Sequence, residues 1–300
     1  MNTTTVSLVP PRVPGGVLLT LAMVTVGSTV VASRIIAAGL PPFTAAALRF
    51  AIALPIFLAL LHWRGQRLPR PGRHDAMLLA LQALCGSVGY AVLLVAGLRT
   101  TSAADAGVIT GCLPAVGALV GALVLRERLG ARLIAGIALA CAGVAAVVAV
   151  PGATAGRHDL AGDALVLAAV GCEALFLLLN KRLHEPVAPL AQSTLMCALG
   201  LAMTFVPALF EHAWTAPADA AALLAVVYYA IVPTVGGYLL WYAGAARVSA
   251  GVASLYTAVL PVSALVLAAV VLRETIGVRQ MVGAACVLGA IAVTGRRAKG

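Results

Sequence analysis

The chain has 300 residues, of which 62% are hydrophobic and only 10% are charged, whereas a soluble domain is on average about 45–50% apolar and about 25% charged. So few charged side chains cannot cover a water-exposed surface of this size, which excludes a soluble enzyme, a disordered chain and a disulfide scaffold and indicates a polytopic membrane protein. The formal net charge of +10 arises from short clusters between long uncharged runs rather than from one basic face, so nucleic acid is not expected as a partner and membrane lipid is.

Ten segments are apolar enough to cross a bilayer, for which about 20 residues are needed. Seven of them carry no charged residue: 13–33, 76–98, 106–125, 133–156, 186–210, 220–246 and 248–272. Three more are imperfect, because 42–63 carries Arg49, 163–180 carries Glu173 and 280–295 is short. The sequence therefore predicts an all-α membrane protein with ten transmembrane helices.

The basic residues are distributed unevenly between the connections. If the N-terminus is cytoplasmic, 14 of the 20 lie on the inside, 5 lie outside, and Arg49 lies within a span. This is the positive-inside bias of membrane proteins. It predicts that both ends of the chain are cytoplasmic.

An internal repeat runs at a constant offset of 147 residues. Leu113-Pro114 recurs as Leu260-Pro261, and the run 124–127 recurs as 271–274. Further matches at the same offset are Pro42 with Pro189, Gly130 with Gly277, Arg132 with Arg279 and Gly136 with Gly283. Each half holds five spans, an odd number, so the second copy must cross the membrane in the opposite sense. We expect two inverted five-helix repeats, 13–150 and 160–295.

Inverted repeats are a recurring architecture of secondary transporters, in which the substrate site lies near the midplane between the halves. Two similar halves can exchange conformations, so that opening to one side mirrors opening to the other. The alternative is a gene duplication without mechanical use.

Several stretches resemble a known family. Val26-Gly27-Ser28 leading to Ala32-Ser33-Arg34, then Leu40-Pro41-Pro42 and Ala47-Leu48-Arg49-Phe50, resemble the opening of an EamA domain. The central Leu-Pro and the following Leu-Arg-Glu of both halves fit the same family, which belongs to the drug/metabolite transporter (DMT) superfamily. One departure is that an aromatic residue common in the first and sixth helices is replaced by Val26 and by its repeat equivalent, Glu173.

The resemblance implies a secondary transporter that exports small metabolites across the bacterial inner membrane by alternating access. Amino acids, neutral or aromatic, are the substrate class it favours. It also implies a cavity lined by the first, third, fourth, sixth, eighth and ninth helices. A multidrug carrier, or a carrier of nucleosides or sugars, with the same fold is the alternative.

An enzyme or a channel is the alternative of a different class. The five His residues lie in or near loops, only one carboxylate lies in mid-span, and no phosphate-binding loop of an ATPase is present. No two of the six Cys residues are within four positions of each other, so the spacing indicates no zinc site. We expect no enzymatic activity, no cofactor and no metal. The oligomeric state stays open, and a monomer is compatible with the sequence.

The candidate substrate-binding residues are polar and aromatic residues in mid-span. Facing a cavity, Tyr and Trp offer apolar surface with a hydrogen-bonding tip, which suits an amphiphilic metabolite. The candidates are Gln82 and Tyr90 in the third span, Glu173 and Phe176 in the sixth, Tyr238, Trp241 and Tyr242 in the eighth, and Tyr256 in the ninth. The alternative is tyrosine that packs between helices or at the membrane interface.

Glu173 is the only carboxylate near the middle of a span. Insertion of an acidic residue there costs about 2.5–3.5 kcal/mol, which favours a functional role such as binding an ammonium group or carrying a proton. A protonated Glu bonded to a neighbouring helix is the alternative. Arg49 is only about two turns into its helix, and we expect it to reach the outer interface or bond helix ends, too far from Glu173 to pair with it.

Two pairs of equivalent residues are expected to shape the fourth and ninth helices. Pro114 and Pro261 each remove a hydrogen bond in mid-span and are candidate hinges, with a fixed kink as the alternative. Arg126-Glu127 and Arg273-Glu274 are expected to cap the ends of the same two helices.

Overall fold

The computed structural model describes residues 13–125, 130–148, 159–213, 219–248, 252–253 and 256–295. All regular elements in these ranges are helices, as the sequence predicts. The first half forms α1 (Gly15–Gly39), α2 (Pro42–Trp63), α3 (Arg73–Gln82), η1 (Ala83–Gly89), α4 (Tyr90–Gly97), α5 (Ala103–Thr110), α6 (Leu113–Leu125) and α7 (Ala131–Val148). The second half forms α8 (Leu160–Asn180), α9 (Pro189–Phe210), α10 (Ala220–Tyr229), η3 (Ala230–Gly236), α11 (Gly237–Ala245), α13 (Val259–Val271) and α14 (Val278–Gly295).

The chain is a multi-pass membrane protein. Six helices in its described part are long and apolar enough to cross a bilayer: Gly15–Gly39, Pro42–Trp63, Arg73–Gly97, Leu160–Asn180, Pro189–Phe210 and Ala220–Ala245. A further candidate is the pair Ala103–Thr110 and Leu113–Gly121, which is bent by 42°. Three apolar helices are shorter: Leu133–Val147, Val259–Val271 and Val278–Val293. Every predicted span thus contains a helix, and six have the length of a full crossing.

The repeat seen in the sequence recurs in the helix boundaries. The helices α2 and α9 begin and end 147 residues apart, and the same is true of α3 and α10 and of α7 and α14. The π-helical segments η1 and η3 are also 147 residues apart at both ends. A π-helix is a rare conformation, often found at functional sites. Its recurrence at the same offset shows that the two halves share one fold.

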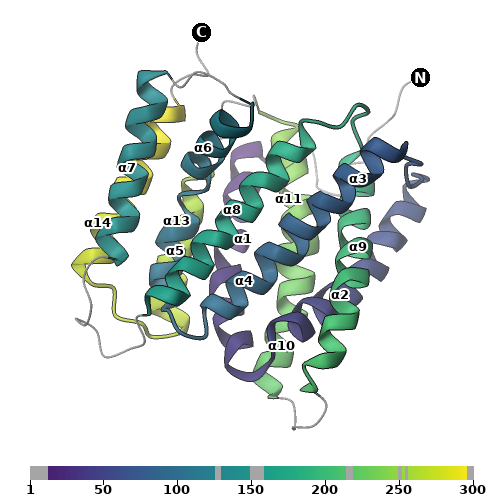
Figure 1. Ribbon diagram of the computed structural model, residues 1–300, viewed down its shortest axis with the longest axis horizontal. Helices are drawn as coiled ribbons and strands as arrows, with labels where there is room; N and C mark the ends of the chain where they lie inside the picture. Colours follow the sequence, from purple (N-terminus) through teal and green to yellow (C-terminus); the bar gives the residue numbers. More distant parts are fainter. Residues whose placement is uncertain are drawn as a thin grey trace.

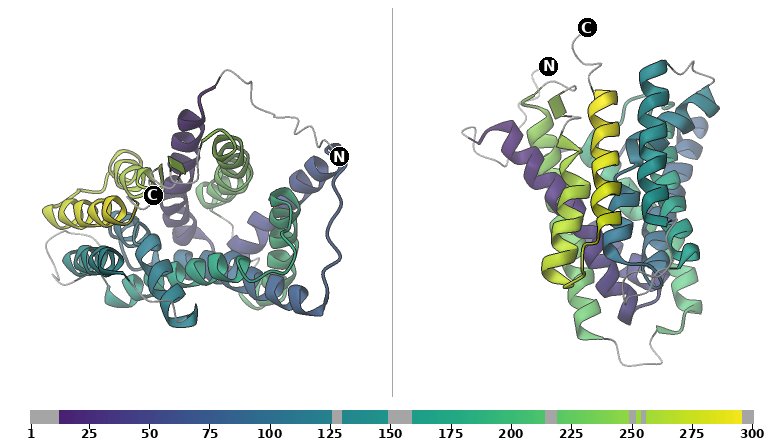
Figure 2. Two further views of the ribbon diagram at one scale, coloured as in Figure 1. Left: turned by 90° about the horizontal axis from the view of Figure 1, so that it is seen from above. Right: turned by 90° about the vertical axis from the view of Figure 1, so that its left-hand side faces the viewer.

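The two repeats pack through equivalent contacts. The helix α2 contacts α9, and α7 contacts α14, so that each helix meets its own repeat equivalent. The helix α1 packs on α10, α11 and α13, while α8 makes the matching contacts with α3, α4, α5 and α6. Figure 1 shows α7 and α14 side by side at one edge, α2 and α9 toward the other, and α1 and α8 between them. Figure 2 shows the pairing of α7 with α14 from two further sides.

Helix starts follow simple sequence rules. Pro42 and Pro189 stand at the first position of α2 and α9, where the missing N–H is not needed. Asp159 and Asp219 precede α8 and α10, and each accepts a hydrogen bond from an N–H group of the first turn, at 3.1 and 3.0 Å. The two Asp caps lie in the second repeat, whereas the two prolines stand at equivalent helix starts in both repeats.

Glu274 caps a helix, but not the one that the sequence predicts. Its carboxylate accepts hydrogen bonds from the N–H groups of Ala103 and Ala104, at 3.0 and 2.8 Å, and so closes the start of α5 in the other repeat. Glu211 accepts from two first-turn N–H groups of α2 in the same way, at 3.0 and 2.7 Å. Both acids therefore join the two repeats. The pair Arg126-Glu127 lies outside the described residues.

The fourth and ninth predicted spans are broken rather than continuous. In the first half α5 ends at Thr110, residues 111–112 form a turn, and Pro114 is the second residue of α6. In the second half residues 257–258 form a turn, one residue before the equivalent positions, and Pro261 lies in the first turn of α13. A proline in the first turn removes no helix hydrogen bond. The expectation that these prolines interrupt a continuous helix is corrected: each begins the helical piece that follows a break.

Candidate functional site

A cavity of about 190 Å³ lies between the two repeats. Its lining comes from α1, α4, the α5–α6 pair, α8, α10 and α13, which are the six helices that the family resemblance implies. The lining residues are Val26, Thr29, Tyr90, Thr110, Leu113, Val170, Glu173, Tyr229 and Leu260.

The cavity lies where the internal symmetry of the chain would place a shared site. Val26 and Glu173 are repeat equivalents, and so are Leu113 and Leu260, and all four line it. The two π-helical segments also border it, because Tyr90 directly follows η1 and Tyr229 directly precedes η3. Both repeats contribute to its walls, the first with five lining residues and the second with four.

Three of the five polar lining residues present hydrogen-bond acceptors. The Thr29 hydroxyl donates to the carbonyl of Val26 at 2.7 Å, and the Thr110 hydroxyl donates to the carbonyl of Gly107 at 3.1 Å. Each hydroxyl proton is therefore bound within its own helix, and the oxygen can offer only lone pairs to a ligand. With the carboxylate of Glu173, the lining suits a ligand group that donates several hydrogen bonds.

Arg49 is buried beside this cavity, so the expectation that it reaches the outer interface is wrong. Arg49 is only 8% exposed, and its guanidinium carbon lies 4.4 Å from the ring centre of Phe50 and 4.7 Å from that of Tyr229. One guanidinium nitrogen donates to the carbonyl of Ser87 at 3.5 Å, while Nε has no hydrogen-bond partner among the described residues. Two aromatic faces hold the cation in place of water.

Tyr229 is the wall between this cation and the cavity. It lines the cavity on one side and a much smaller adjoining space, about 10 Å³, beside Arg49 on the other. No ion pair joins Arg49 to Glu173 among the described residues, and the ring of Tyr229 separates the cation from the cavity. The site thus combines a carboxylate with a guanidinium behind one tyrosine ring.

A model of the EamA-like transporter family matches residues 13–149 and, a second time, residues 160–296. The chain belongs to the EamA-like transporter family. Two matches in tandem agree with the internal repeat, and a family of transporters agrees with the absence of enzymatic activity expected from the sequence.

Relatives support the same conclusion. This EamA-like transporter is 35% identical to the uncharacterized transporter YetK of Bacillus subtilis (strain 168) over 293 residues, which cover 96% of this chain and 88% of that protein. It is 32% identical over 235 residues to a probable terminal-alkyne amino-acid exporter of Streptantibioticus cattleyicolor, covering 77% of each chain. A solved crystal structure superposes with a TM-score of 0.62 over 93% of this chain and 97% of the other, at 23% identity, which shows a shared fold.

Of the eight candidate site residues, the cavity brings together Tyr90 and Glu173. Gln82 is fully buried elsewhere, where its side-chain oxygen accepts a hydrogen bond from Gln192 at 3.2 Å. The same Gln192 nitrogen donates to Asn180 at 2.8 Å. This amide network ties α3, α9 and α8 together away from the cavity lining.

Three aromatic candidates lie on α11 (Gly237–Ala245), outside the cavity lining. The ring of Tyr238 stands perpendicular to that of Phe57, with the ring centres 5.5 Å apart, and lies 4.7 Å from the ring of Tyr242. The half-buried Trp241 belongs to the same helix, α11. None of the three is among the residues that line the cavity.

Phe176 and Tyr256 fill positions opposite glycines. A side chain at Gly86 would clash with the ring of Phe176, so this glycine lets α8 approach η1 closely. A side chain at Gly16 would meet the hydroxyl of Tyr256, which therefore lies against the first turn of α1. The role of these residues in substrate binding stays a prediction.

Three polar lining residues were missed by the sequence reasoning, and the repeat contains a signal for two of them. Tyr229 is the repeat equivalent of Gln82, and Thr29 is the repeat equivalent of Phe176. Extending the candidates Gln82 and Phe176 to their equivalent positions in the other repeat would have found both residues. Thr110 carries no comparable signal, because it lies at the break of the fourth span.

A second cavity, of about 390 Å³, lies among α6, α7 and the start of α8. It is lined almost wholly by apolar side chains, and Asp163 is its only charged lining residue. The carboxylate of Asp163 already accepts a hydrogen bond from Thr101, and one such group in an otherwise apolar lining falls short of the few well-placed polar groups that specificity requires. The smaller cavity between the repeats is the candidate transport site despite its smaller volume.

Proposed function

We propose that this EamA-like transporter exports a small amino acid through the cavity between its repeats, as a secondary transporter of the bacterial inner membrane that works by alternating access. The observation that carries the proposal is the single carboxylate of Glu173 in a cavity shared by the two repeats. The relative described as a probable amino-acid exporter supports the substrate class.

The size of the cavity favours a small solute over a drug. Pockets for drug-sized ligands measure roughly 300–1,000 Å³, whereas this cavity measures about 190 Å³. A multidrug carrier would need a larger site in this conformation. A metabolite of amino-acid size needs no such enlargement.

The lining chemistry favours an ammonium group. An ammonium donates three hydrogen bonds and accepts none. Glu173 offers a charged acceptor, and the hydroxyl oxygens of Thr29 and Thr110 offer lone pairs because their protons are bound to backbone carbonyls. Hydrogen bonds between a charged donor and a charged acceptor are the strong ones. We therefore assign the ammonium end of the substrate to Glu173.

The carboxylate end of the substrate is assigned to the side of Tyr229 and Arg49. The Tyr229 hydroxyl can donate to a carboxylate, and the guanidinium behind its ring supplies positive charge without entering the cavity. The apolar residues Val26, Val170 and Leu260 then surround the side chain. This division suits a neutral amino acid, aliphatic or small aromatic.

We further propose ten crossings in two inverted repeats, 13–150 and 160–295, with both ends cytoplasmic. Contacts between residues at helix ends support this topology, because each contact joins two residues that are predicted to lie on the same side of the membrane. Arg247 donates to the carbonyl of Val13 on the predicted inside, and Arg99 donates to that of Leu40 on the predicted outside. Pro114 and Pro261, each at the start of a helical piece after a break, are the proposed hinges.

Labelling of single cysteines tests the topology. In a background without the six native Cys residues, a cysteine at Gly65 and one at Arg273 should react with a membrane-impermeant reagent from opposite sides of the membrane. Labelling of both from the same side would contradict the inverted repeat.

Counterflow in proteoliposomes tests the substrate. Vesicles containing the purified transporter and loaded with an unlabelled neutral amino acid should accumulate the labelled one transiently, and saturably. The N-acetylated amino acid, which lacks the ammonium group, should not compete, whereas the amine without the carboxylate should compete weakly. Equal competition by the N-acetylated compound, or no counterflow with any amino acid of the panel, would contradict the proposal.

A further inference from the structure

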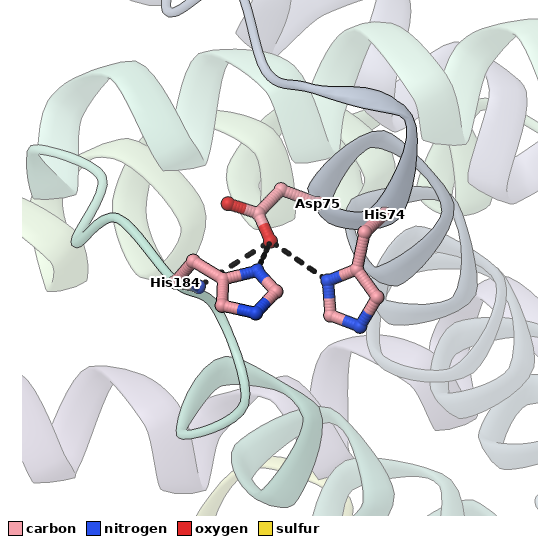
Figure 3. A group of neighbouring side chains, drawn as sticks. All are labelled: His74, Asp75 and His184. Atoms are coloured by element: carbon pink, nitrogen blue, oxygen red, sulfur yellow. Dashed lines mark hydrogen bonds and ion pairs between the residues drawn. The ribbon is translucent and has the colours of Figure 1, made fainter.

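A cluster of three metal-ligating side chains, none of which lines the proposed transport site, lies at the ends of two helices from different repeats. His74 and Asp75 belong to the first turn of α3, and His184 lies in the connection that follows α8. Figure 3 shows both imidazole rings turned toward the Asp75 carboxylate. In sequence Asp75 and His184 are 109 residues apart, so no spacing motif announces the cluster.

The ligand atoms converge on one point. Asp75 Oδ1 lies 3.1 Å from Nδ1 of His74 and 3.0 Å from Nδ1 of His184. One ligand atom from each of the three residues lies within 4.8 Å of the other two. Ligand atoms about 2.0–2.1 Å from a tetrahedral zinc ion are roughly 3.3 Å from one another. Small ring movements would therefore give the spacing that a metal needs.

The backbone already holds the carboxylate in position. The N–H of His184 donates to Oδ1 of Asp75 at 3.3 Å, and the N–H of Glu185 donates to Oδ2 at 3.4 Å. A ligand fixed by hydrogen bonds of this kind loses little conformational freedom on binding a metal. Asp75 is only 12% exposed at its side chain, whereas the side chains of His74 and His184 are 54% and 70% exposed. A metal can therefore enter from water, and water can complete its coordination.

We propose that His74, Asp75 and His184 bind a first-row transition-metal ion, with Zn²⁺ as the reference ion, and that the bound ion bridges the two repeats. Two imidazoles and one carboxylate, with an open fourth position, are a recurrent zinc ligand set. Among the sequence neighbours of these ligands, the basic Arg73, Lys181 and Arg182 outnumber the acidic Glu185, so binding depends on imidazole coordination rather than on net charge. Mg²⁺ and Ca²⁺, which prefer oxygen ligands, are therefore not expected to bind.

Binding is measured on the full chain, purified through a tag without histidine and stripped with a chelator. Titration with Zn²⁺ should give one ion per chain. His184→Ala, a change at an exposed side chain that should leave the fold intact, should weaken binding at least about tenfold, and Asp75→Asn should do the same. His62→Ala is the matched control, because His62 is an exposed histidine on the same predicted side and should leave affinity unchanged.

Two results would overturn the site: no binding of Zn²⁺ by the unaltered chain, or equal affinity in the unaltered chain and in His184→Ala. With Co²⁺ as the probe, a thiolate-to-metal absorption band would assign binding to cysteine instead and would also overturn it. Comparable binding of Mg²⁺ would contradict imidazole coordination.

The bridging role rests on the proposed alternating-access function and has its own readout. Because the ligands come from both repeats, bound Zn²⁺ should hold them in one arrangement and slow transport in proteoliposomes, but not in His184→Ala. Undiminished transport with Zn²⁺ bound would overturn the bridge. If no transport of any amino acid is found, the proposed function fails, whereas the measured Zn²⁺ affinity still decides the metal site.

Discussion

Val26 of α1 and Glu173 of α8 hold equivalent positions in the two repeats, and both line the cavity between them. The walls are therefore related by the repeat, but their chemistry is not, since one of the two positions carries a carboxylate and the other a methyl-bearing side chain. This difference gives a nearly symmetric cavity one end that can bind a cation.

Removing one hydroxyl should distinguish a cavity tyrosine from a packing tyrosine. Tyr90→Phe removes a polar group that lines the cavity, and we expect a several-fold rise in KM for the transported amino acid. Tyr238→Phe keeps the ring contacts with Phe57 and Tyr242 and should leave KM unchanged. Uptake by counterflow at varied substrate concentration measures both. A rise in KM for Tyr238→Phe alone would place the substrate against α11 instead.

Arg49→Lys should impair transport although it keeps the positive charge. A lysine ammonium lacks the flat guanidinium that lies against Phe50 and Tyr229, and contacts of this kind are worth up to about 2 kcal/mol when buried. We expect Tyr229 to lose its fixed position and the substrate affinity to fall about tenfold. Arg99→Lys, which also removes a guanidinium bonded to a carbonyl, is the control and should transport normally. Normal affinity in Arg49→Lys would show that charge alone suffices.

Glu274→Ala should lower stability rather than substrate affinity. The change removes the acceptor for two N–H groups at the start of α5, and hydrogen bonds to a charged group contribute about 1.5–3 kcal/mol. A lower apparent melting temperature in detergent is expected, while Glu185→Ala, at an exposed side chain, should change it little. An unchanged melting temperature in Glu274→Ala would mean that water replaces the cap without loss.

The helices and the repeat could be predicted because lipid imposes a strong constraint on sequence. Apolar runs of sufficient length mark the spans, and the predicted start at Pro42 is confirmed, whereas the helix predicted over 186–210 begins at Pro189. The π-helical segments could not be predicted, because η1 and η3 contain ordinary apolar residues whose backbone is set by packing.

The site was harder to predict than the fold. The position of Arg49, two turns from a helix end, led to the expectation that it reaches the interface. Position along a helix does not determine exposure, however, and two aromatic rings enclose this side chain. Helical periodicity shows which residues share a face but not which neighbour that face meets. Tyr90 and Tyr238 look alike in sequence, yet only the first lines the cavity.

Glu173→Gln should reduce substrate affinity and flatten the pH dependence of transport. Glutamine keeps the shape and one acceptor, but it has no charge and cannot exchange a proton. The loss of a charge-assisted hydrogen bond of about 1.5–3 kcal/mol corresponds to roughly 10- to 100-fold in affinity. Counterflow at several pH values measures both effects. An unchanged affinity together with an unchanged pH profile would assign Glu173 to structure.

Moving the carboxylate across the repeat gives the sharpest test. Glu173→Val should abolish amino-acid counterflow, because it leaves the cavity without a charged acceptor among its lining residues. Adding Val26→Glu to that variant returns a carboxylate to the same cavity from α1, and partial counterflow should return with it. The shared cavity permits this exchange, because the two positions are repeat equivalents and both line it. Val31→Glu in the Glu173→Val background is the control, since Val31 lies in the same helix but does not line the cavity, and it should restore nothing. If Val26→Glu restores no counterflow while the double variant inserts and melts like the unaltered chain, the carboxylate acts through a partner specific to α8 rather than through the shared cavity.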